Sequence, residues 1–364
     1  MRLSARLLVA GLAVVAAGSM VGCSTSHGVA YANGAIKPSS RNATASAPAS
    51  TAPAANAAQA STAQAATPPI LPAPTGAASG SPSQTPSSAS PAPSATPAGP
   101  RIEVAGGPRG VKAKAGILAD ATTGQVLWDK SGDVPRPIAS ITKVMTAYLV
   151  IQAGDLGRKV TIPKAVLNYV AKYGANSAGL VPGNVLTVDQ LLHALLLVSA
   201  GDAAYTLAST YGPGLPAFVA KMNATALKLG LTHTHFTSPD GLPYPSEWST
   251  YSTPAELLKL GEVAMRSAEF RSIVDERFYT MKKGPGHRSY WWDNSNDLIG
   301  YYRGAIGIKT GYTDKAGHCL LFEAVRGDRD LIGVVLGSPP TGPAAGAQDA
   351  ARVLNWGFAL KDTE

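Results

Sequence analysis

The first 100 residues of this 364-residue chain contain no aspartate or glutamate, only four basic residues, and 13 prolines. Beyond residue 23 this stretch is low-complexity sequence rich in alanine, serine, threonine and proline, with Tyr31 as its one aromatic residue. Such a segment cannot bury enough apolar surface to offset the entropy lost on ordering. We therefore expect a disordered linker over residues 24–108 and one folded domain over residues 109–364.

Residues 1–23 have the features of an export signal. Arg2 and Arg6 precede an apolar run over residues 7–21 that is short for a membrane span. The run leads into Met-Val-Gly-Cys23, which resembles the lipobox of bacterial lipoproteins, whose cysteine is lipidated and becomes the first residue. We expect a lipoprotein-type signal peptide and a place in the bacterial cell envelope, anchored through Cys23 to the outer face of the plasma membrane. The alternative is ordinary signal cleavage followed by secretion.

Composition excludes several functional classes. The formal net charge of the chain is +8, but residues 101–364 carry 27 basic and 23 acidic residues, an excess too small to indicate nucleic-acid binding. Two cysteines cannot form a disulfide framework, and no Cys/His cluster has the spacing of a zinc site, so we expect no metal and no cofactor. The sequence contains no repeated long apolar run, which excludes a protein with several membrane spans.

Apolar patterns in the remaining chain alternate between strand-like and helix-like segments. They predict strands at 115–119, 126–128, 305–310, 319–325 and 331–336, and helices at 141–151, 187–196, 202–211 and 345–360. Thr187 and Gln190 form a capping box that marks the start of the second helix. Strands at both ends with helices between them favour an α+β fold, an antiparallel sheet flanked by helices with a helical subdomain.

Ser140 and Lys143 form the first motif with catalytic chemistry. A serine three residues before a lysine at a helix start places both side chains on one face, one turn apart. A serine hydroxyl is a weak nucleophile that needs an adjacent base, and a lysine amine can serve when burial lowers its pKa. The alternative interpretation is that Ser140 only caps the helix.

Two further motifs follow along the chain. Lys309-Thr-Gly311 ends the strand predicted at 305–310, where the lysine cation and the hydroxyl of Thr310 could bind a carboxylate, and glycine lets a substrate backbone lie along the strand. Ser199-Ala-Gly-Asp202 lies between two predicted helices, where Ser199 could relay a proton. The alternative interpretation of this segment is a helix-breaking loop.

In this order the three motifs resemble those of the penicillin-recognising serine enzymes, and the chain is most similar to the low-molecular-mass D-alanyl-D-alanine carboxypeptidases of peptidase family S11. Supporting segments of the resemblance, which covers roughly residues 110–340, are Asp120–Leu127, His235-Phe236, Asp240-Gly-Leu242, Tyr251–Ala255 and Lys309–Asp314. The resemblance implies a β-lactamase/transpeptidase-like fold, peptidoglycan pentapeptide stems as substrate and β-lactams as covalent inhibitors.

The resemblance also implies a role for each site residue. Ser140 would be the acylated nucleophile, Lys143 its general base, and Ser199 a relay that passes a proton to the leaving D-alanine. Lys309, Thr310 and Gly311 would hold the terminal carboxylate end of the substrate, and the backbone N–H groups of Ser140 and Tyr312 would form the oxyanion hole. The acyl-enzyme would then pass to water or to an amine.

Two departures from the family pattern leave alternatives open. The second motif of the family is usually Ser-x-Asn, and here Gly201 stands at the asparagine position. Only 53 residues follow Gly311, too few for the C-terminal β-domain of many relatives, so we expect a minimal form without that domain. The alternatives to a carboxypeptidase are a D,D-transpeptidase or a non-catalytic wall-binding protein. A β-lactamase is disfavoured because no convincing Glu-x-x-x-Asn segment lies between Ser199 and Lys309.

Overall fold

The computed structural model describes residues 106–342 and 344–360. The predicted signal peptide over residues 1–23 with Cys23, and residues 24–105 of the predicted linker, lie outside the described residues. Within the described ranges, no helix is long and apolar enough to cross a membrane.

A five-stranded antiparallel sheet has the order β2-β1-β11-β10-β9. Its strands are β1 (Ala115–Asp120), β2 (Val126–Lys130), β9 (Ala305–Thr313), β10 (Gly317–Arg326) and β11 (Arg329–Ser338). Three two-stranded pairs accompany it, and they join β3 (Arg136–Pro137) to β6 (Tyr251–Ser252), β4 (Lys159–Thr161) to β5 (Val185–Thr187), and β7 (Phe278–Met281) to β8 (Tyr290–Asp293).

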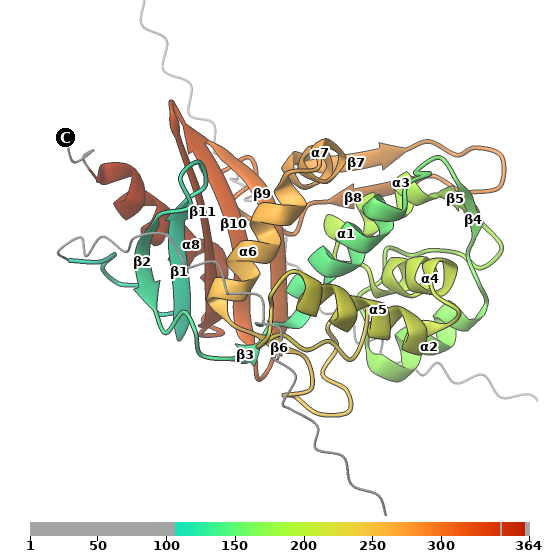
Figure 1. The fold of residues 1–364 in the computed structure, drawn as a ribbon. Coiled ribbons are helices and arrows are strands. Elements are labelled where there is room, and N and C mark those ends of the chain that lie inside the picture. Colours follow the sequence, from blue (N-terminus) through green and yellow to red (C-terminus); the bar gives the residue numbers. More distant parts are fainter. Residues whose placement is uncertain (1–105, 343, 361–364) are drawn as a thin grey trace, which may run out of the picture. The chain divides into compact units, whose positions relative to one another are not determined.

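Eight α-helices and one short 3₁₀ turn occur in the described part of the chain (Figure 1). They are η1 (Ala139–Thr142), α1 (Lys143–Ala153), α2 (Ala165–Tyr173), α3 (Val188–Leu196), α4 (Gly201–Tyr211), α5 (Leu215–Lys228), α6 (Pro254–Met265), α7 (Ala268–Asp275) and α8 (Ala345–Ala359). Helices α1 to α5 gather beside the sheet, whereas α6 lies across it. The α+β fold expected from the sequence is therefore confirmed.

Side chains of the central strands alternate between two hydrophobic clusters because successive residues of a strand point to opposite faces. On β11, Ile332 and Val334 belong to the larger cluster, which includes residues of α1, α3, α4, α6 and α7. Leu331 and Val335 face the smaller cluster, built with Val353 and other residues of α8. Helices thus cover both faces of the sheet, while β9 remains an edge strand.

The structure corrects two boundaries predicted from the sequence. The helix expected from residue 141 begins as the 3₁₀ turn η1, and regular α-helix starts only at Lys143. The strand expected to end at Thr310 continues to Thr313, so Lys309-Thr-Gly311 lies inside the strand and not at its end. The apolar pattern stops at Ile308, but pairing with β10 continues through Gly311 to Thr313.

Candidate active site

Ser140 and Lys143 come together where η1 passes into α1. Lys143 Nζ lies 3.0 Å from Ser140 Oγ, at hydrogen-bond distance, and it also donates to the backbone oxygen of Asp240 at 2.8 Å. Ser140 is half-buried, whereas Lys143 is only 3% exposed. The spacing found in the sequence therefore produces a hydroxyl in direct contact with a buried amine.

Burial determines the protonation of Lys143. It lowers the pKa of the ammonium to about 8, although the negative charges of Asp240 and Asp202 act in the opposite direction. An amine with this pKa is neutral in an appreciable fraction of molecules near neutral pH, and a neutral amine can accept a proton from a nearby hydroxyl.

Strand β9 brings the second motif against η1. A Cβ atom at Gly311 would lie 2.8 Å from the oxygen of Ile138 and 3.1 Å from the nitrogen of Ser140, so only glycine allows this close approach. Lys309 Nζ is buried and contacts the backbone oxygen of Thr310 at 3.0 Å and its Oγ1 at 3.3 Å. Burial and the positive charge of Lys143 hold the pKa of Lys309 well below its usual value.

The turn between α3 and α4 carries Ser199. Its backbone has a left-handed φ of 58°, and its hydroxyl is buried without a hydrogen-bond partner among the described residues. Ser295 links this turn to β9, because its N–H donates to the oxygen of Leu197 and its Oγ lies 2.9 Å from Thr310 Oγ1. The side chain of Tyr312, the next residue of β9 after Gly311, is about half exposed, at 47%.

Gly201 begins α4 in tightly filled space. A Cβ atom there would lie 2.6 Å from Ala175 Cβ, 3.0 Å from Asp240 Oδ2 and 3.2 Å from the oxygen of Asn176. The family asparagine therefore does not fit at this position unless its neighbours move.

Replacing Gly201 with asparagine should lower the free energy of unfolding by about 2 kcal/mol, because overpacked sites force neighbouring atoms apart. Urea denaturation of the purified chain would measure the change. Adding Ala175→Gly should recover part of the loss, because it removes the closest contact.

Gly157 offers a matched control, since a Cβ there meets nothing within 4 Å. Gly157→Asn should leave the denaturation midpoint nearly unchanged. A Gly201→Asn protein as stable as the parent would contradict the packing argument.

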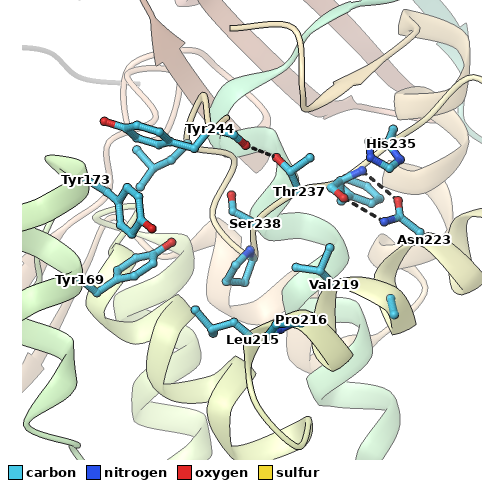
Figure 2. Close-up of a pocket in the computed structure, with 14 residues that line it drawn as sticks. Tyr169, Tyr173, Leu215, Pro216, Val219, Asn223, His235, Thr237, Ser238 and Tyr244 are labelled. Carbon is cyan, nitrogen blue, oxygen red and sulfur yellow. Dashed lines mark hydrogen bonds between the residues drawn. The ribbon is translucent and has the colours of Figure 1, made fainter. Parts of the chain in front are cut away.

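A cavity of about 530 Å³ is lined in part by Thr237, Ser238 and Tyr244, which flank Asp240 in the sequence (Figure 2). Tyr169, Tyr173 and Tyr244 line one side, while Leu215 and Val219 line another. The lining includes none of the residues predicted to be catalytic or to bind substrate. It is therefore a separate hollow that shares the 237–244 loop with the site.

Several residues that contact the site carry no recognisable signal in the sequence. In the sequence, Asp240 is noticed only because Asp240-Gly-Leu242 is one of the segments that resemble the family. Neither Tyr169 nor Ser295 belongs to any motif. The contact of Tyr169 with Asp240 spans 71 residues of sequence, so no local pattern predicts it. The one sequence feature that points to these contacts is Gly201. It stands where the family has asparagine, and the missing side chain implies that other groups fill that space.

Among the described residues, no group of three or more His, Cys, Asp or Glu side chains could hold a metal ion. A hydroxyl lies beside a buried amine, and a second buried amine is near enough to feel the charge of the first. This arrangement suits a serine nucleophile that takes an acyl group from an anionic substrate.

The family model and two curated relatives that this chain matches are all D-alanyl-D-alanine carboxypeptidases. Residues 103–340 match the D-alanyl-D-alanine carboxypeptidase family, Peptidase S11. The chain is 41% identical over 262 residues to the D-alanyl-D-alanine carboxypeptidase of Streptomyces sp. strain K15, an alignment that covers 69% of this chain and 88% of that one. It is 39% identical over 245 residues to DacB2 of Mycobacterium tuberculosis, covering 67% and 81%.

Among solved structures, the Streptomyces K15 DD-transpeptidase superposes with a TM-score of 0.65 at 41% identity, over 69% of this chain and 98% of that one. The K15 relative is thus named a carboxypeptidase in one comparison and a transpeptidase in the other.

Proposed function

The chain belongs to the D-alanyl-D-alanine carboxypeptidase family, peptidase family S11, and on that premise we propose that Ser140 and Lys143 are its nucleophile and general base. The protein is a serine-type D-alanyl-D-alanine carboxypeptidase that acts on peptidoglycan, outside the cytoplasm. The observation that carries the assignment is the 3.0 Å contact between Ser140 Oγ and a Lys143 amine whose pKa is about 8.

The acylation step follows from this contact. Neutral Lys143 takes the proton of Ser140 Oγ as the oxygen attacks the carbonyl carbon of the D-Ala–D-Ala peptide bond. Negative charge then develops on the carbonyl oxygen, where the backbone N–H groups of Ser140 and Tyr312 stabilise it. Lys143 then gives this proton up through Ser199 to the nitrogen of the leaving D-alanine as the peptide C–N bond breaks, and an ester on Ser140 remains.

Lys309 and Thr310 bind the terminal carboxylate of the stem peptide. Burial and Lys143 depress the pKa of Lys309 in the free enzyme, and a substrate carboxylate beside it would favour its charged form. Gly311 keeps β9 close to Ser140. A substrate carboxylate bound by Lys309 and Thr310 would therefore lie near the nucleophile. This arrangement selects peptides with a free C-terminus.

Transpeptidation is a second function that one observation favours. Gly201 stands where the second motif of the family has asparagine, so the site lacks that amide. In such a site an amine could attack the acyl-enzyme instead of water. The similar K15 structure is that of a DD-transpeptidase. Both reactions share the acyl-enzyme on Ser140 and differ only in its acceptor.

One assay separates these outcomes. The purified enzyme is incubated with a diacylated Lys-D-Ala-D-Ala peptide, with and without glycine as acceptor, and the products are quantified by mass spectrometry. Free D-alanine with the shortened peptide is expected, whereas a dominant glycine adduct would make transfer the main reaction. Neither product, together with no penicillin adduct, would refute both enzymatic functions, and rapid penicillin hydrolysis would indicate a β-lactamase.

We further propose that Cys23 is lipidated after removal of residues 1–22, and that the linker over residues 24–108 joins this anchor to the catalytic domain over residues 109–364. Cys23→Ser should move the protein from the membrane fraction to the soluble fraction of a bacterial host, as followed by immunoblotting. The only other cysteine is the buried Cys319, and Cys319→Ser should leave the partitioning unchanged. Membrane association of Cys23→Ser equal to that of the parent would exclude the lipid anchor.

A further inference from the structure

Asp240 is one of three residues, with Ala175 and Asn176, that crowd Gly201, where the family asparagine is missing. Its Oδ2 lies 3.0 Å from the position of a Cβ atom at Gly201, and the residue is only 1% exposed. A carboxylate so deeply buried is expensive unless donors satisfy it. Its placement beside the catalytic lysine therefore calls for an explanation.

Three donors hold the Asp240 carboxylate in place. The hydroxyl of Tyr169 donates to Oδ2 at 2.9 Å, and the hydroxyl of Ser238 donates to Oδ1 at 2.8 Å. The N–H of Leu242 donates to Oδ1 at 3.3 Å. Tyr169 and Ser238 also line the cavity of Figure 2, and Oδ2 of Asp240 lies near Gly201 at the start of α4.

The same residue contacts Lys143 through its backbone, whose oxygen accepts the second hydrogen bond of Nζ at 2.8 Å. We propose that the Asp240 carboxylate is a positioning residue that replaces the missing amide: it anchors its own carbonyl against Lys143 and stabilises the Lys143 ammonium. It acts through Lys143 and does not touch substrate. This inference rests on the proposed role of Lys143 as general base.

The charges around Lys143 single out Asp240. Asp240 opposes the effect of burial on the pKa of Lys143 more strongly than does Asp202, which lies on α4. Ser177 and three backbone N–H groups donate to the carboxylate of Asp202, whereas Asp240 also accepts a hydrogen bond from Lys143 through its backbone oxygen. Lys309 on β9 is a basic group near Lys143. Tyr169 on α2 donates a hydrogen bond to the Asp240 carboxylate.

Asp240→Asn tests the proposal, because asparagine has the same shape without the charge. The measurement is the second-order rate of acylation by fluorescent penicillin between pH 5.5 and 9.5. In the parent this rate should rise with pH through about 8, as Lys143 loses its proton. Without the Asp240 charge the ammonium is less stable, so the rise should move to lower pH by about one unit.

A folded Asp240→Asn protein whose rise stays at the parent pH would overturn the inference. Asp349→Asn is the matched control, because Asp349 is equally buried but lies on α8, bound by Ser338 and Arg352. It should lower the unfolding temperature without moving the rise.

Tyr169→Phe gives a second test that does not depend on how well Asp240→Asn folds. It removes one donor to the carboxylate but keeps the charge, so the pH of the rise should not move. The limiting acylation rate at high pH should fall about threefold to tenfold, because the Asp240 carbonyl is held less firmly. A parental rate would refute the positioning role. Failure of the parent itself to acylate would instead refute the proposed function.

Discussion

Ser140→Ala will abolish covalent labelling by fluorescent penicillin and lower D-alanine release at least about 10³-fold. The hydroxyl is the group that forms the ester, so no other group in the variant can replace it. Mass spectrometry of the penicillin-treated parent should place the adduct on the peptide that contains Ser140.

The fold should survive this substitution. Ser140 is half-buried, and its hydroxyl contributes one hydrogen bond with Lys143, worth about 1 kcal/mol. The unfolding temperature should therefore change by only a few degrees. Lys130-Ser-Gly132 is similar in sequence to Lys309-Thr-Gly311, and its serine is exposed. Ser131→Ala should therefore label like the parent. A penicillin adduct on a different residue of Ser140→Ala would refute the assignment of the nucleophile.

Local patterns predicted those parts of the fold that depend on neighbours in sequence. Thr187 and Gln190 do form the capping box at the start of α3, with both reciprocal hydrogen bonds present. The runs of apolar residues located β10 and β11 and the turn between them, because strands buried on both faces are nearly continuous in apolar residues. Ser140 and Lys143 were correctly brought together because they are one helical turn apart.

Contacts between distant segments were beyond the reach of the sequence. The strand β9 extends past its apolar pattern because backbone pairing with β10, and not side-chain character, sustains it. Helix α2 was not predicted, yet its Tyr169 is the group that fixes the Asp240 carboxylate. Gly201 showed that an amide was missing, but only the fold shows that the Asp240 carboxylate lies beside Gly201. The roles of the site residues, which rest on family resemblance, stay predictions for the experiments above.

Lys143→Met should change activity and stability in opposite directions. Acylation should fall at least about 10³-fold, because no general base remains beside Ser140. The residual rate should also lose the rise with pH through about 8 that the neutral amine produces in the parent. Penicillin acylation between pH 5.5 and 9.5 measures both effects.

The stability argument follows from the same pKa. Folding lowers the pKa of Lys143 from 10.5 to about 8, so below pH 8 the folded state must bury a cation that the unfolded state keeps in water. The lowered pKa of Lys143 destabilises the parent by about 3 kcal/mol below pH 8. The penalty disappears as pH rises from 8 to 10.5, because the unfolded chain then loses the proton as well.

Methionine has a similar length and no charge, so Lys143→Met removes the penalty. It also removes two hydrogen bonds, to Ser140 Oγ and to the backbone oxygen of Asp240, each worth about 1 kcal/mol. The variant should therefore unfold at higher denaturant concentration than the parent at pH 7, with a gain of about 1 kcal/mol that is lost towards pH 10. Lys172→Met, at an exposed lysine on α2, should show no such pH-dependent gain. A Lys143→Met protein less stable than the parent at pH 7 would show that the amine is not held as a destabilised cation, and would remove the physical basis for its role as a base.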